Sequence, residues 1–264
     1  MSDSAFILPL LYEFDAPANV LIAGATGGIG LAFMQALASH PQVARLIGVA
    51  RRATASPALA ALAASHPERI VLCDCAIGDE AALAGMTTRV QAVADRLHLV
   101  INTVGLLHEG VLQPEKTLAQ VTLASLQASF AINAFAPILL AKALLPLLRH
   151  AEPAVFASLS ARVGSIGDNR LGGWYSYRAA KAAQNQLLRT LAIELTRLNP
   201  QSIVLALHPG TVDTGLSKPF QARVATDRLF TPAFSATALL AVIATKKPSD
   251  SGSFHAWDDQ PIDW

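Results

Sequence analysis

The sequence predicts an α/β fold in which a parallel, doubly wound sheet carries helices on both faces. Three observations lead to this prediction: short apolar runs alternate with helical segments, the runs are apolar enough to be buried strands, and no linker interrupts the alternation. Buried strands separated by helices pair in parallel, because each connection crosses one face of the sheet. Since such crossovers are right-handed, a doubly wound sheet is the simplest topology.

The order of the expected elements follows from this alternation. In the first half, strands are expected over residues 19–23, 46–50, 69–75 and 97–103, with helices over 28–39, after Pro57 and from about Asp79. The second half continues with a long apolar helix over about 123–149, a strand over 154–159, a helix over 176–198, a strand over 202–207 and a last helix around 232–245.

The domain organisation is expected to be simple. No repeat or composition shift marks a boundary, so residues 1–264 are predicted to form a single domain, with residues 1–18 as an N-terminal extension. Residues 210–231 form the longest segment without a clear period, and loops of this length often cover substrates. We therefore expect this segment to line a substrate pocket with Leu216, Pro219 and Phe220.

Composition excludes several classes of protein. Hydrophobic residues make up 52% of the chain and charged residues 15%, so a large core is expected and disorder is not. Twenty Lys and Arg against 19 Asp and Glu give no basic excess, and nucleic acid is not expected as a partner. Cys73 and Cys75 lie in an apolar run, which is typical of core residues in a reducing compartment. With no signal peptide and no clean membrane-spanning run expected, the protein is predicted to be cytoplasmic and not membrane-bound.

A glycine-rich turn follows the first expected strand and opens a helix. Glycine allows a tight turn there, and the free amides of the helix N-terminus attract a pyrophosphate. The spacing fits two patterns, one through Gly24, Gly28 and Gly30 and another through Gly24, Gly27 and Gly30. A turn that binds no ligand is the alternative, but the order strand, turn, helix favours a dinucleotide. The expected contacts are Gly24, Thr26, Gly27, Gly28, Ile29 and Gly30.

The end of the second expected strand indicates which dinucleotide is bound. A carboxylate there would accept hydrogen bonds from the adenosine ribose and repel a 2′-phosphate. The chain instead has Arg51 and Arg52, whose guanidinium groups offer planar donors for a phosphate. The sequence therefore predicts NADP(H) in preference to NAD(H), although two solvated loop charges would look the same.

Tyr177 and Lys181 are four residues apart, so on a helix they share one face. A cation close to a tyrosine favours the phenolate and lowers the phenol pKa, which suits the pair to move a proton to or from an alcohol oxygen. The alternative is that both side chains are exposed on the helix surface and take no part in catalysis. The position after the fifth expected strand favours the catalytic interpretation.

The chain resembles the short-chain dehydrogenase/reductase family from about Asn19 to its end, so the fold is expected to be of the Rossmann type. The segments that carry the resemblance are Ser160-Ala161-Arg162-Val163-Gly164-Ser165-Ile166, Gly172-Gly173-Trp174-Tyr175-Ser176-Tyr177-Arg178 and His208-Pro209-Gly210-Thr211-Val212-Asp213-Thr214. It looks most like the branch with the C-factor signalling protein and sniffer-type carbonyl reductases. Asn102-Thr103-Val104-Gly105 stands where the family has N-N-A-G.

The resemblance implies roles for single residues. Asn133 would anchor a water that relays protons from Lys181, and Asp74 would accept from the adenine amino group. Further cofactor contacts implied in this way are Asn102, Val104, Gly105, Tyr177, Lys181, Pro209, Gly210, Val212 and Thr214.

The catalytic serine is the least direct assignment. The family often has two adjacent serines after the fifth strand and uses the second, but Ala161 stands at that place. Ser160 is preferred here over Ser158 and Ser165. The histidines show no metal-ligand spacing, and no metal is expected.

The sequence thus predicts an oxidoreductase that moves hydride between NADP(H) and a carbonyl or alcohol substrate through Tyr177, Lys181, Ser160 and Asn133. The alternative is a dinucleotide-binding signalling protein of the C-factor type. An epimerase of the extended type is disfavoured by chain length. The helix near residues 130–148 is apolar nearly all round, which, with the resemblance, predicts a homodimer or homotetramer.

Overall fold

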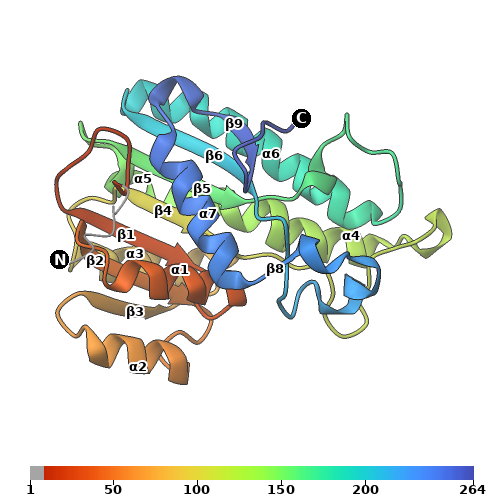
Figure 1. The fold of residues 1–264 in the computed structure, drawn as a ribbon, viewed down its shortest axis with the longest axis horizontal. Coiled ribbons are helices and arrows are strands. Elements are labelled where there is room, and N and C mark those ends of the chain that lie inside the picture. Colours follow the sequence, from red (N-terminus) through yellow and green to blue (C-terminus); the bar gives the residue numbers. More distant parts are fainter. Residues whose placement is uncertain (1–8) are drawn as a thin grey trace.

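A computed structural model of the chain describes residues 9–264. Seven strands form one sheet in the order β3-β2-β1-β4-β5-β6-β9, and every pair in it is parallel (Figure 1). The strands are β1 (Ala18–Ala23), β2 (Val43–Ala50), β3 (Ile70–Asp74), β4 (Leu99–Asn102), β5 (Ala154–Leu159), β6 (Ser202–His208) and β9 (Ser253–Ala256). The order reverses between β1 and β4, where a doubly wound sheet leaves a crevice at its carboxyl edge. The predicted Rossmann-type fold is confirmed.

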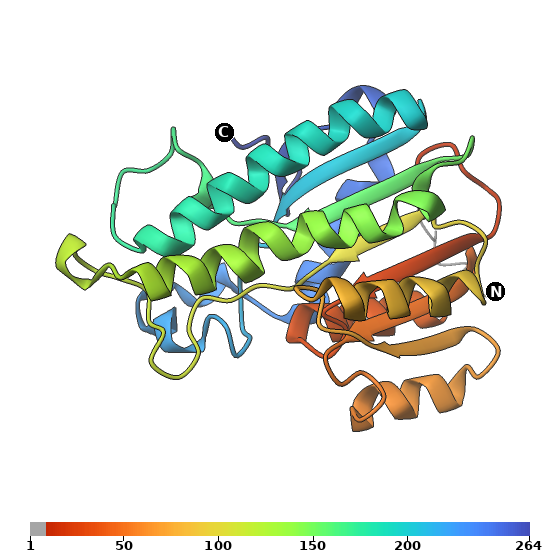
Figure 2. The same cartoon turned by 180° about the vertical axis from the view of Figure 1, so that it is seen from behind.

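Helices cover both faces of the sheet. One face carries α1 (Gly28–Ala38), α2 (Pro57–Ser65) and α7 (Pro232–Thr245), as Figure 1 shows. The opposite face, seen in Figure 2, carries α3 (Glu80–Gln91), α4 (Leu123–Phe130), α5 (Ala136–Leu148) and α6 (Tyr175–Leu198). Several helix starts are set by the local sequence: Asp79 caps α3, while Ser56 and Thr231 cap α2 and α7 ahead of a proline in the first turn.

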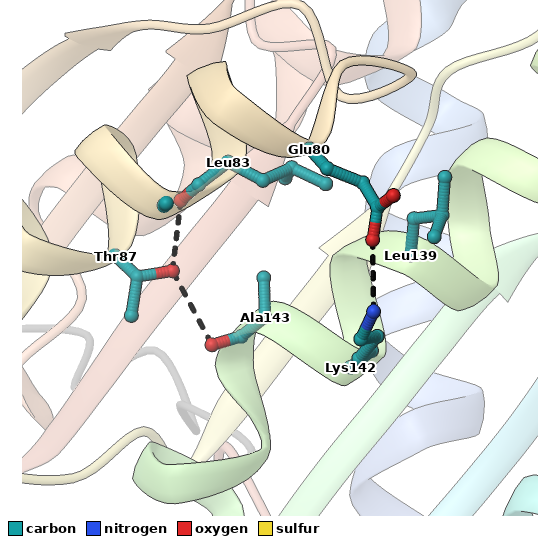
Figure 3. Close-up of a pocket in the computed structure, with 7 residues that line it drawn as sticks. Glu80, Leu83, Thr87, Leu139, Lys142 and Ala143 are labelled. Carbon is teal, nitrogen blue, oxygen red and sulfur yellow. Dashed lines mark hydrogen bonds and ion pairs between the residues drawn. The ribbon is translucent and has the colours of Figure 1, made fainter.

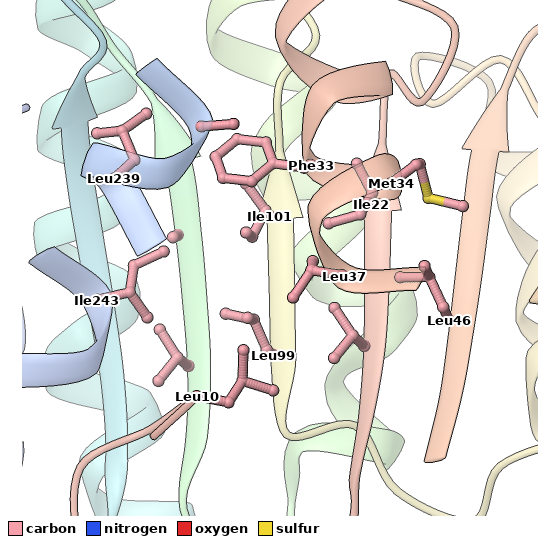
Figure 4. Close-up of a cluster of buried hydrophobic side chains, with 14 of the residues drawn as sticks. Leu10, Ile22, Phe33, Met34, Leu37, Leu46, Leu99, Ile101, Leu239 and Ile243 are labelled. Atoms are coloured by element: carbon pink, nitrogen blue, oxygen red, sulfur yellow. The ribbon is translucent and has the colours of Figure 1, made fainter. Parts of the chain in front are cut away.

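The core has one apolar layer on each face. In the first layer, α1 and α7 lie side by side over the sheet and interdigitate with its central strands (Figure 4). The labelled side chains of this layer are Leu10, Ile22, Phe33, Met34, Leu37, Leu46, Leu99, Ile101, Leu239 and Ile243, all at most 3% exposed. Such packing fixes the strand ends that build the site, because a close-packed interior leaves them little freedom.

The long helix expected over residues 123–149 is present but interrupted. A π-turn over Ala131–Phe135 separates α4 from α5, and π-turns inside helices often mark functional sites. The expectation that no apolar run could span a membrane was wrong by length and composition, since an 18-residue window within Leu123–Leu148 has a mean hydropathy of 1.8. Half of that window is buried within the fold.

Three features of the fold were not predicted. Strand β9 closes one edge of the sheet beside β6. The segment 210–231 contains a two-stranded ladder of β7 (Thr211–Val212) and β8 (Leu229–Phe230). Within the expected N-terminal extension, Leu10, Leu11 and Phe14 are buried, and residues 1–8 lie outside the described part.

Candidate active site

The glycine turn needs glycine at two positions for steric reasons. Gly24 has a φ of +85°, and a Cβ there would lie 2.4 Å from Oγ1 of Thr103. A Cβ at Gly30 would lie 2.1 Å from the carbonyl oxygen of Gly24. Gly27 precedes α1 without a side-chain cap, so the first amides of this helix are left for an anion.

Two adjoining cavities open at the carboxyl edge of the sheet. The glycine-turn cavity, of about 300 Å³, is lined by Gly27, Gly28, Ile29, Gly30, Thr103, Val104, Gly105, Leu159, Ser160, Tyr177, Lys181, Pro209, Thr214, Gly215 and Leu216. The loop cavity, of about 250 Å³, is lined by Ile29, Leu107, Ser160, Ala161, Arg162, Val163, Trp174, Tyr177, His208, Pro209, Gly210, Thr211, Val212, Thr214, Leu216, Ser217, Phe220 and Val224. Ser160 and Tyr177 line both cavities and therefore lie where the two meet.

A third hollow, which shares no lining residue with these two cavities, lies between α3 and α5 (Figure 3). There the exposed side chains of Glu80 and Lys142 form an ion pair at 2.8 Å, and Thr87 donates to the carbonyl of Ala143. No candidate catalytic residue lines this groove, so it is no part of the site.

Tyr177 and Lys181 are buried together on α6. The ammonium Nζ of Lys181 lies 5.8 Å from the centroid of the Tyr177 ring. Burial raises the pKa of the Tyr177 phenol, and burial lowers the pKa of Lys181 to about 7. The expected lowering of the phenol pKa is therefore not seen here, because desolvation disfavours the phenolate. The neutral phenol that results is the form that donates a proton.

The three candidate serines have different surroundings. Ser158 is fully buried and accepts hydrogen bonds from Nδ2 of Asn102 and Nε2 of Gln184, each at 2.8 Å. Ser165 is buried and accepts from the backbone N–H of Asp168. Of the three, Ser160 alone lines the two cavities, and its hydroxyl donates to Oδ1 of Asn185 at 2.6 Å.

Asn133 is fully buried in the π-turn and close to Lys181. Its side chain exchanges hydrogen bonds with the backbone of Leu106, at 2.9 Å and 2.7 Å, and also donates to Ser129. A Cβ at Gly105 would lie 3.5 Å from Oδ1 of Asn133 and 4.0 Å from Nζ of Lys181, so both groups flank Gly105. Asn102 is also fully buried, and its Oδ1 accepts from the N–H of Val104.

The predicted adenosine end is open to solvent. Arg51 and Arg52 are exposed at the end of β2, and Arg51 faces Glu109 at 3.9 Å. The carboxylate of Asp74 accepts from both the N–H and the hydroxyl of Thr54, and these bonds lower its pKa. Asp74 thus orders the loop that carries both arginines. Thr26 is exposed in the glycine turn.

The loop cavity has an aromatic wall. Trp174 packs edge-on against Phe220, with ring centroids 5.1 Å apart, and against Tyr177 at 6.3 Å. Leu216 and Phe220 line the cavity as expected, whereas Pro219 does not. His208 also lines it, and its buried Nδ1 has no hydrogen-bond partner among the described residues. Burial is the main cause that lowers the pKa of His208 to about 4, so its ring is neutral at pH 7.

A known protein family matches most of this chain. Residues 18–225 match the family model described as short chain dehydrogenase. The chain belongs to the short-chain dehydrogenase family. Its relatives include C-signal of Myxococcus xanthus, which is 34% identical over 148 residues, or 56% of this chain and 83% of that protein.

Solved structures resemble this short-chain dehydrogenase over most of its length. An NADPH-bound carbonyl reductase from chicken fatty liver is 29% identical with a TM-score of 0.83, covering 94% of this chain and all of that one. The carbonyl reductase Sniffer of D. melanogaster has the same TM-score and coverage at 24% identity and so supports the fold. The resemblance drawn from the motifs is confirmed, and the protein is an oxidoreductase of this family.

Most predicted site residues of this short-chain dehydrogenase come together at the two cavities. From the predicted set, Gly27, Gly28, Ile29, Gly30, Val104, Gly105, Ser160, Tyr177, Lys181, Pro209, Gly210, Val212 and Thr214 line one or both. Gly24, Asn102 and Asn133 line neither cavity: Gly24 is half-buried, and Asn102 and Asn133 are fully buried. Arg51, Arg52 and Asp74 are exposed at the carboxyl ends of β2 and β3. Within residues 9–264 no cluster of three or more metal-ligating side chains occurs.

Sequence reasoning missed Gln184, Asn185, Glu115 and His208. Gln184 and Asn185 lie three and four residues after Lys181 on α6, so their spacing places them on its face of the helix and was a usable signal. The role of Glu115 depends on contact with Ser176, 61 residues away, and no local pattern shows it.

Proposed function

We propose that this short-chain dehydrogenase reduces a carbonyl compound with NADPH and that Tyr177 donates the proton. The observation that carries the proposal is that Tyr177 and Lys181 are buried together where the glycine-turn cavity meets an apolar second cavity. The NADPH-bound carbonyl reductase that it resembles supports the same reaction type.

The glycine-turn cavity suits a dinucleotide, since it begins at an uncapped helix N-terminus and ends at Lys181. Bound NADPH would supply a hydride to the carbonyl carbon. Tyr177 Oη then gives its proton to the carbonyl oxygen, which completes the alcohol. Ser160 hydrogen-bonds that oxygen, Lys181 holds the ribose beside Tyr177, and Asn133 supports a water that resupplies the proton.

A proton-donor test uses Tyr177→Phe, which removes only the hydroxyl. NADPH oxidation should be screened against a panel of aldehydes, ketones and quinones. Turnover of any accepted substrate should fall by about 100-fold or more, the usual scale for losing a general acid. Tyr175→Phe, two residues away and 42% exposed, is the matched control and should keep parental turnover. Near-parental turnover by Tyr177→Phe would overturn the mechanism.

Preference for NADPH over NADH is proposed from Arg51 and Arg52. Arg51 pairs only loosely with Glu109, in an exposed ion pair that costs little to break, so its guanidinium can turn to a 2′-phosphate. Fluorescence titration should show about ten- to a hundred-fold tighter binding of NADPH, and Arg51→Asp should remove most of this difference. Equal affinities of the parent for both nucleotides would contradict the assignment.

A second candidate is a signalling protein that binds the dinucleotide without turnover. Ala161 at the usual serine position and the similarity to C-signal favour it. Tight NADPH binding with no reduction of any carbonyl in the panel would select this candidate.

The proposal also includes a cytoplasmic location and assembly into a homodimer or homotetramer. Phe135, between α4 and α5, and Ile193, on α6, are 51% and 52% exposed, which suits a contact between copies. Light scattering at micromolar protein tests the assembly, and a clean monomer would count against it.

A further inference from the structure

Gln184 is a fully buried amide that contacts a candidate catalytic group. It lies on α6 three residues after Lys181, and its Oε1 accepts a hydrogen bond from Nζ of Lys181 at 2.8 Å. Its Nε2 donates to Oγ of Ser158 at 2.8 Å and to the carbonyl of Leu159 at 3.2 Å. Both ends of the amide are therefore satisfied, and loss of its Oε1 would leave one more N–H of the buried Lys181 ammonium without an acceptor.

These bonds continue beyond Gln184 to a second segment that lines the glycine-turn cavity. Ser158 accepts from Nδ2 of Asn102, and Oδ1 of Asn102 accepts from the N–H of Val104. Val104 and Lys181 both line that cavity. A buried chain of hydrogen bonds thus fixes the ammonium relative to the backbone of Val104, which lines the same cavity.

The ammonium of Lys181 has no carboxylate partner among the described residues. Its Nζ donates to the carbonyl of Leu159 at 2.8 Å and to Gln184, and an ammonium has three N–H donors, so one is left for a ligand. Tyr177 is the titratable group that faces it, and burial is the single cause that lowers the pKa of Lys181 to about 7. A neutral acceptor such as Gln184 favours the charged form without binding it as an ion pair would.

We propose that Gln184 is a positioning residue, which holds the ammonium of Lys181 in place to face bound NADPH and Tyr177. This inference rests on the role proposed above for Lys181. It predicts that the charge state of Lys181, and with it the pH dependence of NADPH binding, depends on the acceptor at position 184.

The test is a fluorescence titration of NADPH between about pH 5 and 9, which needs no substrate. In the parent protein, affinity should fall as pH rises through about 7, where Lys181 loses its proton. Gln184→Leu removes the acceptor, so the midpoint should move down by about one pH unit. Gln184→Glu adds a negative charge beside the ammonium, so the midpoint should move up by at least as much.

Gln186→Leu is the matched control, because Gln186 is exposed on the same helix and its amide contacts Thr190. Its binding curve should coincide with that of the parent, and the titration of the nucleotide phosphate is common to all curves. Circular dichroism checks folding, and Gln184→Met replaces Gln184→Leu if the latter does not fold.

Two outcomes separate this inference from the proposed function. Parallel binding curves for the parent and the Gln184 variants, with only a lower melting temperature, would show that Gln184 is structural and overturn this inference alone. Failure of the parent to bind NADPH at any pH would overturn the proposed function and this inference together.

Discussion

At the scale of single residues, the hydroxyl of Ser160 already donates a hydrogen bond within the protein. Its hydroxyl donates to Oδ1 of Asn185 at 2.6 Å, and Asn185 is held in turn by its contact with the carbonyl of Gly164. To hydrogen-bond a substrate oxygen, the Ser160 hydroxyl has to rotate away from Asn185. Any stabilisation of the developing oxyanion by Ser160 is therefore reduced by the loss of that buried bond.

The three serines can be separated by substitution with alanine. Ser160→Ala should lower turnover by roughly ten- to a hundred-fold, less than loss of an oxyanion donor that is free to act. Ser165→Ala should leave turnover at the parental level, since Ser165 lies outside both cavities. Steady-state kinetics on one accepted substrate decides between them, and a larger loss for Ser165→Ala than for Ser160→Ala would refute the assignment.

Ser158→Ala should act chiefly on stability. It leaves Nδ2 of Asn102 without a partner and removes one of the two acceptors of Nε2 of Gln184, in a fully buried site. Unpaired buried donors cost about 1–3 kcal/mol each, so urea unfolding should show a loss in that range. An unchanged free energy of unfolding would mean that a water replaces the lost hydroxyl.

At the scale of elements, helix α6, which carries Tyr177 and Lys181, begins without a side-chain cap of its own. Trp174 at its N-cap has a φ of +52° and makes no side-chain cap bond. Glu115 from a distant loop takes that role: it accepts from the N–H of Ser176 at 3.2 Å and from the Ser176 hydroxyl. Burial alone would raise the pKa of Glu115, but these hydrogen bonds outweigh it and the pKa is lowered.

Removing this carboxylate should loosen the start of α6. Glu115→Ala should lower the free energy of unfolding by about 1–3 kcal/mol, because two donors lose a charged acceptor at a helix N-terminus. Glu109→Ala, in the same loop but exposed, is the control and should stay within about 0.5 kcal/mol of the parent. Urea unfolding measures both, and equal losses would argue against the capping role.

Elements with a strong local pattern could be predicted from the sequence. The glycine turn, the Tyr177–Lys181 spacing and the first six strands of the sheet all carried such patterns and were found. Strand β9 (Ser253–Ala256) was missed because it has only four residues. It is an edge strand that pairs with β6, and half-buried and buried positions alternate along it, so it lacks the continuous apolar run of the central strands. The π-turn was missed because Ala131–Phe135 has ordinary helix formers, and its extra residue is held by the tertiary bonds of Asn133.

At the scale of the whole molecule, one buried histidine, His98, connects three segments that are far apart in the sequence, through contacts with Phe14, Asn19 and Glu152. His98 is 3% exposed, and its Nδ1 accepts from the N–H of Asn19 at 2.9 Å, while Nε2 pairs with Glu152 at 2.8 Å. Phe14 stacks on its ring with centroids 4.9 Å apart. A protonated ring could not accept from Asn19, so this arrangement needs the neutral form.

The pH dependence of stability follows from the direction of the pKa shift. Burial is the main cause that lowers the pKa of His98, and it outweighs the opposing hydrogen bond to Glu152. The folded pKa therefore lies below the unfolded value of about 6.5, so between the two the unfolded chain binds more protons. Stability is full above the unfolded pKa and is lost as pH falls through this window. His208, whose pKa burial lowers to about 4, adds to the same loss.

Urea unfolding from about pH 7.5 down to pH 5 should show a falling free energy of unfolding, by at most about 1.4 kcal/mol per pH unit for each histidine. In His98→Asn, the side-chain oxygen takes the place of Nδ1 and cannot titrate, so the slope should become shallower although packing against Phe14 is reduced. Phe14→Leu is the matched control: it should lower stability at every pH and leave the slope nearly parental, because His98 stays in place and covered. Equal slopes for the parent and His98→Asn would show that His98 does not couple protonation to folding, and the acid sensitivity would then belong to His208 or the carboxylates.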